Sequence, residues 1–231
     1  MDFSGRRVVV TGGTGALGTA VVGELLTAGA VCTVPYVHEA EAQSFPRRGD
    51  PNVTLIAVSD LADETQVARV YDGLEPWASI HIAGGFAPGK VTETDKKALM
   101  AQIDSNLASC FLCCRAAAKV MLSSGGGRIV NVAARPALEW RSGAGMTAYT
   151  VAKAGVAALT VALAEEVAKD GVLVNAVAPS IMDTPANRKA MPKANFDAWP
   201  KVEEVAATIL FLASPDNRVT RGAIVPVYGK S

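Results

Sequence analysis

The chain has 231 residues, of which 50% are hydrophobic and 19% charged, and its 22 basic and 22 acidic side chains give a formal net charge of zero. This composition predicts one domain, residues 1–231, with a sizeable buried core. Balanced charge without a long basic run argues against a nucleic-acid surface. No uninterrupted apolar stretch reaches the roughly 18 residues of a membrane span, and the N-terminus lacks the pattern of a signal peptide. We therefore expect a cytoplasmic protein without a membrane segment.

Short apolar runs alternate with longer segments of helical periodicity along the whole chain. In order, the expected elements are strand 7–11, helix 16–28, strand 30–35, strand 54–58, helix 62–72, strand 79–83, helix 94–122, strand 127–132, helix 148–169, strand 173–178, helix 201–213 and strand 222–228. This alternation predicts an α/β fold, a Rossmann-type doubly wound parallel sheet of about seven strands with helices on both faces.

The stretch "VVVTGGTGALGTAVVGELL" passes from the first strand through a glycine-rich turn into the first helix. Glycines spaced three apart let the chain turn sharply and let a pyrophosphate approach the free N–H groups of the helix N-terminus. An ordinary glycine turn is the alternative, but the position between a strand and a helix favours a dinucleotide. The loop residues expected at the cofactor are Gly12, Thr14, Gly15, Ala16, Leu17 and Gly18.

The choice between NAD and NADP stays open in the sequence. NAD-binding folds of this kind place an acidic residue at the end of the second strand to hold the ribose, but Pro35 stands there in this chain. The glycine loop contains no Arg that would favour NADP. Arg47 and Arg48 are candidates for a 2′-phosphate, although a solvated turn is the simpler place for them.

Asp60 and Leu61 follow the third strand, where a bound dinucleotide would place its adenine. Asp60 is also placed to cap the helix expected over 62–72. The two interpretations are compatible.

The cysteines give little sign of a metal site. The four are Cys32, Cys110, Cys113 and Cys114, the last three within one apolar segment. A metal site would need a second pair of ligands, and the only histidines are His38 and His81. We therefore expect buried, reduced cysteines and no metal.

Tyr149 and Lys153 are four residues apart, so they share one face of the helix expected over 148–169. A buried ammonium near a phenol stabilises the phenolate and should lower the pKa of Tyr149 from about 10. This pair predicts a proton donor in a reduction, with Lys153 also able to hold the nicotinamide ribose. An interfacial Tyr beside a solvated Lys is the structural alternative.

Taken in order, the glycine loop, "HIAGGF", Asn106, Tyr149-x-x-x-Lys153 and "VNAVAPS" resemble the short-chain dehydrogenase/reductase family over nearly the whole chain. The resemblance implies hydride transfer with NAD(P)(H), NAD against NADP unresolved, and a catalytic set of Tyr149, Lys153 and Asn106. Asn106 would support a water-mediated proton path to the Lys.

The resemblance also names residues around that set. His81 stands where the family usually carries Asn, so a structural hydrogen-bonding role is expected for it. Further residues expected to border the cofactor are Ala83, Gly84, Gly85, Asn131, Pro179, Ser180, Ile181 and Thr184. For Thr184, capping of the segment that follows it is the alternative.

Three stretches narrow the match to the dihydropteridine reductase branch: "AGGFAPG" (83–89), "GAGMTAY" (143–149) and "MDTPANRKAMPKANFDAW" (182–199). Like that branch, the chain lacks the family's upstream Ser and has Ala134 in its place. Ser142 and Thr147 are nearby in sequence but do not occupy the expected position. The resemblance implies reduction of a quinonoid dihydropteridine, in which charge spreads through the ring.

The irregular segment 182–200 contains three prolines, and a loop of this length in a compact domain is typical of a substrate lid. Two other functions stay open, a reductase of a small ketone or quinone and a non-catalytic dinucleotide sensor. The family resemblance further implies a homodimer or homotetramer formed through helices 94–122 and 148–169.

Overall fold

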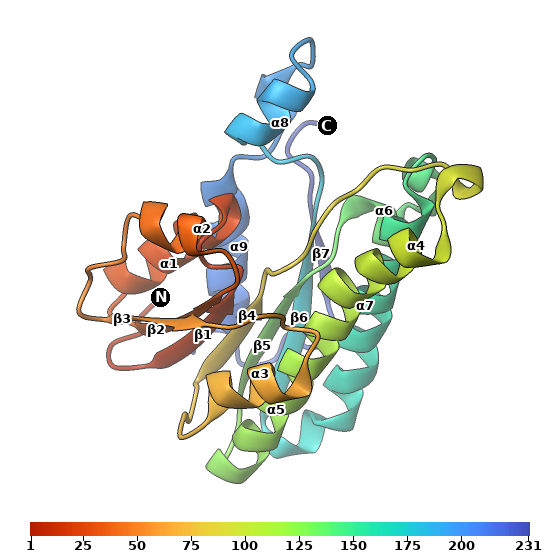
Figure 1. The fold of residues 1–231 in the computed structure, drawn as a ribbon. Coiled ribbons are helices and arrows are strands. Elements are labelled where there is room, and N and C mark those ends of the chain that lie inside the picture. Colours follow the sequence, from red (N-terminus) through yellow and green to blue (C-terminus); the bar gives the residue numbers. More distant parts are fainter.

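The computed structural model describes residues 1–231 and contains one seven-stranded sheet in which every pair of neighbouring strands is parallel. The strand order is β3-β2-β1-β4-β5-β6-β7. This confirms the predicted fold class (Figure 1). The strands are β1 (Arg7–Thr11), β2 (Val31–Tyr36), β3 (Val53–Ala57), β4 (Ala78–His81), β5 (Gly127–Val132), β6 (Val172–Pro179) and β7 (Ile224–Val227).

Helices cover both faces of the sheet, with α1 and α9 on one side and α3, α5 and α7 on the other (Figure 1). The α-helices are α1 (Ala16–Thr27), α2 (Glu39–Ser44), α3 (Glu64–Tyr71), α4 (Lys96–Gln102), α5 (Ser109–Ser124), α6 (Arg135–Leu138), α7 (Thr147–Glu166), α8 (Pro185–Ala190) and α9 (Val202–Ala213).

The core consists of two apolar layers that the sheet separates. Val8 and Val10 of β1 pack toward α1 and α9, whereas Val9 between them packs toward α3 and α5. Successive side chains of a strand point to opposite faces, so a strand covered on both faces needs apolar residues throughout. This is why the strands appear in the sequence as uninterrupted apolar runs.

The order of the strands also fixes where a ligand can bind. β1 lies between β2 and β4, so the chain leaves β1 toward one edge of the sheet and returns to β4 on the other side. Parallel sheets bind ligands beyond the carboxyl ends of the strands at such a switch point. Both the glycine loop after β1 and the "AGG" turn after β4 leave the sheet there.

The helix expected over 94–122 is not continuous. Between α4 and α5 lies a π-helical segment, Ile103–Ala108, which widens the helix by one residue per turn. The helix expected from residue 62 begins at Glu64 instead, because the Asp63 carboxylate accepts hydrogen bonds from two backbone N–H groups of its first turn.

Three short helices were not expected, because α2, α6 and α8 span only four to six residues and show little apolar periodicity. Segment 182–200 contains one of them, α8, which projects away from the body of the molecule (Figure 1).

Two helices are long and apolar enough to cross a membrane by length and composition, Lys96–Ser124 and Thr147–Glu166. The expectation that the chain has no membrane segment rested on the length of uninterrupted apolar runs, and this different criterion does not contradict it. Core helices of folded domains pass the same test, and both of these helices pack on the sheet. The core accounts for part of their apolar character, because 39% and 28% of the residues in the two apolar windows are buried.

Candidate active site

The glycine loop forms a close-packed turn at the end of β1. Gly12 has a φ of +67°, which favours glycine, and Gly15 caps α1 in an extended conformation (φ −75°, ψ 178°). A Cβ on Gly18 would collide with the Gly12 carbonyl oxygen, whereas a Cβ on Gly15 would meet only that oxygen, at 3.4 Å. Gly12 and Gly18 thus shape the turn itself, and Gly15 leaves its outer surface open for a ligand.

A cavity of about 610 Å³ runs from this turn across the carboxyl ends of the strands. It joins the glycine loop to the turn after β4 and to the loop after β3. The residues expected at the cofactor that line it are Gly12, Thr14, Gly15, Ala16, Leu17, Gly18, Asp60, Leu61, Ala83, Gly84 and Gly85. A glycine-lined cavity beside a helix N-terminus fits the diphosphate of a dinucleotide.

At the adenosine end, Asp60 lines the cavity and its carboxylate accepts a hydrogen bond from Ala62 N at 2.8 Å. It forms a turn there but does not cap α3. Glu41, on the unexpected α2, also lines the cavity and accepts a hydrogen bond from Thr14 Oγ1 at 3.0 Å. Sequence reasoning missed Glu41 because it sought an acidic residue at the strand end. Neither Arg47 nor Arg48 lines the cavity.

A second cavity, of about 200 Å³, continues from the first. The two share Leu17, Ile82, Gly84 and Gly85. The second brings together the three residues expected in catalysis, which come from two separate helical segments. Its lining includes Phe86, Asn106, Val132, Ala133, Ala134, Tyr149, Lys153, Pro179, Ser180 and Met182.

Tyr149 and Lys153 of α7 lie together, with Lys153 Nζ 5.9 Å from the centre of the Tyr149 ring. Lys153 is buried and donates a hydrogen bond to the Val132 carbonyl at 2.8 Å, and burial lowers its pKa from 10.5 to about 8. Burial raises the pKa of Tyr149 to about 12. The expectation that the pKa of Tyr149 is lowered is therefore wrong for the protein without a bound ligand. Desolvation raises this pKa, and the Lys153 ammonium does not offset the effect because it donates its hydrogen bond to the Val132 carbonyl.

Asn106 lies in the π-helical segment and is 1% exposed. Its Nδ2 donates to the Gly85 and Gln102 carbonyls, but its Oδ1 has no hydrogen-bond partner. A Cβ built on Gly84 would lie 2.5 Å from this Oδ1 and 3.4 Å from Lys153 Nζ. The unpaired acceptor and the ammonium thus lie over the same glycine, an arrangement that suits a bridging water.

No hydroxyl replaces the missing Ser. Ala134 is buried and lines the second cavity, whereas Ser142 is exposed and donates its hydroxyl to the Glu139 carbonyl. Thr147 begins α7 and does not line the cavity. The one aliphatic hydroxyl in the lining, that of Ser180, donates to the Tyr228 carbonyl at 3.0 Å. The Tyr149 phenol is the other hydroxyl group in this lining.

The remaining candidates divide into lining and supporting residues. Pro179 and Ser180 line the second cavity, but Ile181 and Thr184 do not. Thr184 Oγ1 accepts from Asn187 N at 3.2 Å, so it caps α8. Asn131 is fully buried in β5 and lines neither cavity, so its expected place at the cofactor is wrong.

Phe86 was not expected at the site. Its ring packs edge-on against that of Tyr149, with the centroids 5.1 Å apart.

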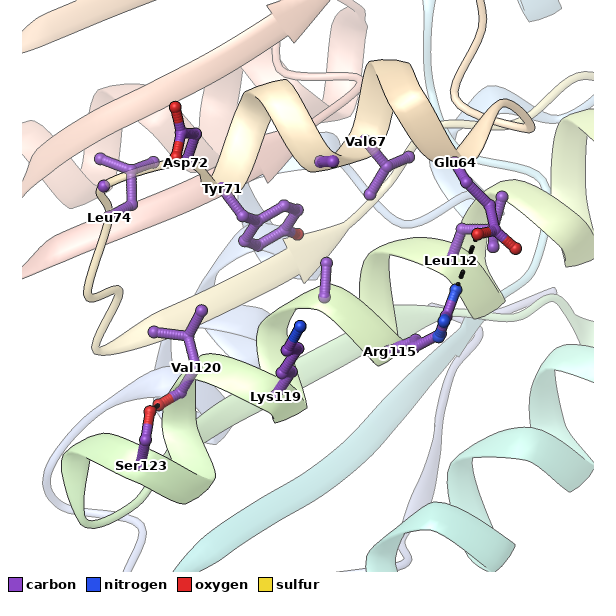
Figure 2. A pocket seen from close by; sticks show the side chains of 13 residues that line it. Glu64, Val67, Tyr71, Asp72, Leu74, Leu112, Arg115, Lys119, Val120 and Ser123 are labelled. Carbon is purple, nitrogen blue, oxygen red and sulfur yellow. Dashed lines mark hydrogen bonds and ion pairs between the residues drawn. The ribbon is translucent and has the colours of Figure 1, made fainter.

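A further groove lies away from these residues, between α3 and α5, with a volume of about 490 Å³ (Figure 2). An ion pair between Arg115 Nη1 and Glu64 Oε2, 3.0 Å apart, closes one end of it. Tyr71 projects from α3 toward α5 in its wall. None of the residues expected in catalysis or cofactor binding lines this groove.

The short chain dehydrogenase family matches residues 6–195 of this chain. The chain belongs to the short-chain dehydrogenase/reductase family. It is 37% identical to the galactitol 2-dehydrogenase of Rhizobium johnstonii over 246 residues, covering 97% of this chain and 94% of the relative. It is 32% identical to the 2,3-dihydroxy-2,3-dihydro-p-cumate dehydrogenase of Pseudomonas putida, covering 100% and 96%.

Among solved structures, that of ElxO with NADP bound is similar, with a TM-score of 0.88, 25% identity and coverage of 97% of this chain and 98% of the other. The family membership confirms an NAD(P)-dependent oxidoreductase acting on a small molecule. Neither relative is named a dihydropteridine reductase.

The open space beside Gly15 predicts that a larger side chain at this position obstructs the cofactor. The extended backbone of Gly15 suits Val, so Gly15→Val should fold normally while its side chain fills the space that the diphosphate needs. We expect the affinity for NADH and NADPH to fall by roughly tenfold or more, measured by calorimetry. The matched control is Gly23→Val in the same helix, where an added Cβ has no neighbour closer than 3.8 Å. Unchanged affinity in Gly15→Val would place the diphosphate elsewhere.

Proposed function

We propose that this enzyme uses a reduced nicotinamide cofactor to reduce a conjugated imine of the quinonoid dihydropteridine type, with Tyr149 as the proton donor. The main observation in support is that Tyr149 and Ala134 line the same small, largely apolar cavity. The cavity offers one phenol without an internal partner and no second hydroxyl free to donate.

The chemistry of the substrate decides whether one donor is sufficient. Hydride transfer to a ketone develops a localised alkoxide, which benefits from several donors aimed at the same oxygen. Hydride transfer to a quinonoid ring spreads the developing charge over several atoms, so one proton donor at the imine nitrogen is sufficient. The edge of Phe86 and the side chains of Val132 and Met182 provide an apolar setting for a flat ring.

The cofactor supplies the hydride when it is bound, and the residues of the chain supply the proton. With its pKa raised to about 12, Tyr149 keeps its proton at neutral pH and presents it to the substrate. Lys153 carries a positive charge below its pKa of about 8 and would stabilise the phenolate left after transfer. Asn106 Oδ1 would hold a water that returns a proton through Lys153.

The second candidate is reduction of a small ketone or oxidation of the matching alcohol. The similarity to galactitol and dihydrodiol dehydrogenases favours it. A dinucleotide sensor without catalysis is the least supported function, because it would not need Tyr149, Lys153 and Asn106 around one cavity.

NADH is the proposed cofactor. The adenosine end of the cavity contains the Glu41 carboxylate, and neither Lys nor Arg is among its lining residues. A carboxylate accepts hydrogen bonds from a ribose hydroxyl and repels a 2′-phosphate.

Glu41→Gln should therefore weaken NADH binding and reduce the preference of the enzyme for NADH over NADPH. Loss of a hydrogen bond to a charged group is worth about 1.5–3 kcal/mol, or roughly 10- to 100-fold in affinity. The measurement is the dissociation constant of each cofactor at fixed ionic strength. Glu39→Gln, on the same helix but outside the cavity, is the control. An unchanged ratio of the two affinities would remove Glu41 from the specificity site.

Segment 182–200 is proposed to close over the substrate. Met182 lines the second cavity, and within the segment Arg188 binds the Asp183 carboxylate at 2.6 and 2.7 Å and lies over the Phe196 ring at 4.8 Å. These contacts hold α8 together as a unit, while the helix projects from the body of the molecule (Figure 1).

Hydrogen exchange of residues 182–200 should slow when NADH and a non-reducible pterin analogue are added together, because closure buries their backbone N–H groups. Peptides from α3, on the far side of the sheet, serve as the control. Equal exchange in the free and doubly bound enzyme would argue against a lid.

Two substitutions test the proposed reaction. Tyr149→Phe should lower turnover of quinonoid dihydropterin by about 10²-fold or more while cofactor affinity stays nearly constant, because only the proton donor is lost. Ala134→Ser should leave pterin reduction within a few-fold and raise activity on a panel of ketones, where an added donor stabilises the alkoxide. Initial rates of NADH oxidation provide the measurement, and Tyr228→Phe, outside both cavities, is the control.

Full activity of Tyr149→Phe would exclude this mechanism. Ketone turnover by the unaltered enzyme without pterin turnover would favour the second candidate.

Association into a homodimer or homotetramer stays a prediction. The exposed side chains of Phe111, Leu122, Val151 and Val161 on α5 and α7 support these helices as the contact surface.

A further inference from the structure

A cluster of four donor atoms lies in the core between β4, β5 and α5. His81 Nδ1, Cys110 Sγ and Cys114 Sγ lie within 4.8 Å of one another. Asn131 Oδ1 lies 2.8 Å from His81 Nδ1 and 3.3 Å from each of the two sulfurs. We propose that these four side chains form a binding site for a thiophilic divalent ion, with Zn²⁺ the expected occupant.

The fold brings these residues together from three elements. The register of the sheet pairs His81 at the end of β4 with Asn131 in β5, so both side chains point to the same face. Cys110 and Cys114 are one helical turn apart on α5, which covers that face. Sequence analysis expected no metal site because it sought the second ligand pair among His38 and His81 and did not consider the Asn131 amide.

The sulfurs lie near tetrahedral separations from Asn131 Oδ1, at 3.3 Å each, whereas His81 Nδ1 and Asn131 Oδ1, 2.8 Å apart, must separate to admit an ion. With Zn–S bonds of about 2.3 Å and Zn–N bonds of about 2.0–2.1 Å, neighbouring ligand atoms are separated by roughly 3.4–3.8 Å. Cys114 Sγ already lies 3.4 Å from His81 Nδ1. A pair of ligand atoms at the 4.8 Å bound would have to approach by about 1 Å, which requires rotation of the cysteine side chains.

The hydrogen bonds of this cluster converge on one oxygen atom. The Asn131 Oδ1 has two lone pairs, but three groups point at it, the His81 ring N–H and both thiols. A cation at the centre of the cluster replaces this competition with one bond to each donor atom.

Groups around the cluster are arranged as supports for the ligands. Asn131 Nδ2 donates to Thr160 Oγ1 at 2.9 Å, which fixes Oδ1 toward the cluster. His81 Nε2 lies 2.8 Å from Ser79 Oγ, which in turn lies 2.7 Å from the Tyr71 hydroxyl. When Nδ1 binds the ion, the ring proton moves to Nε2 and is donated to Ser79 Oγ. Ligating histidines commonly hold their other ring nitrogen in this way.

The charges of a loaded site balance. Two thiolates, a neutral imidazole and a neutral amide compensate a divalent cation, and binding releases to solvent any proton still on the two thiols. Neutrality matters because the Lys153 ammonium is close enough to act on Cys110.

Tyr71 lies between the cluster and the groove that α3 and α5 form. Tyr71 forms part of the groove wall (Figure 2), and its hydroxyl bonds Ser79 beside His81. Loading during folding would place the ion before this ring closes the core over it.

The site is tested on the full-length protein produced in medium supplemented with Zn²⁺ or Co²⁺ and purified under reducing conditions without a chelator. We expect one ion per chain by mass spectrometry of the metal content. The Co²⁺ protein should show thiolate-to-metal charge-transfer absorption in the near ultraviolet and the intense visible bands of tetrahedral Co²⁺. Thermal unfolding should occur at a higher temperature with the ion than without it.

Cys110→Ser and Cys114→Ser should each lose the ion and the charge-transfer band. The matched control is Cys113→Ser, on the same helix and equally buried, which lies outside the cluster and should keep both. Absence of the charge-transfer band in the unaltered Co²⁺ protein overturns the proposal, and this result does not depend on any variant folding. Retention of the ion by Cys114→Ser, or its loss from Cys113→Ser, also overturns it.

Discussion

The active site depends on one desolvated ammonium. Lys153 is 5% exposed, and its burial lowers its pKa to about 8, so the fold keeps a group in the core that water would hold more favourably. The Val132 carbonyl, at the end of β5, accepts one of its protons. Every other part of the site is arranged around this charge, with Tyr149 one turn before it on α7 and the unpaired Asn106 Oδ1 opposite.

Close packing of helices sets the position of that oxygen. A Cβ on Gly155 of α7 would lie 2.7 Å from Leu107 Cδ2 in the π-helical segment, so a larger residue there would require the Leu107 side chain to move. The wider turn of the π-helix directs Asn106 toward Gly85 and Lys153 instead of leaving its side chain on the outer face of a regular helix. The π-helical segment and the absence of a side chain at Gly155 of α7 thus together position the residues of the proposed proton path.

The sheet could be predicted from the sequence because buried parallel strands require continuous apolar runs, and all seven lie within two residues of the observed bounds. The π-helical segment could not, because the apolar pattern of 94–122 fits a regular helix equally well, and Asn106 was found only through the family resemblance. Glu41 was missed because α2 is too short to show periodicity. Asn131 was wrongly predicted to border the cofactor. Its side chain could point to either face of β5, and the continuous apolar sequence of this strand does not show which face is the correct one.

The face of β5 that hides Asn131 from the cofactor is also the face that carries the cluster of His81, Cys110 and Cys114. The cluster therefore lies behind the wall of the catalytic cavity, and its charge acts on Lys153 through the core. A thiolate at Cys110 raises the pKa of Lys153 and opposes the effect of burial. The proposed divalent ion would compensate the thiolate charge and remove this support, so the Lys153 ammonium would become a stronger acid when the cluster is filled. Ion binding at the cluster and proton loss from Lys153 would therefore be coupled through the core.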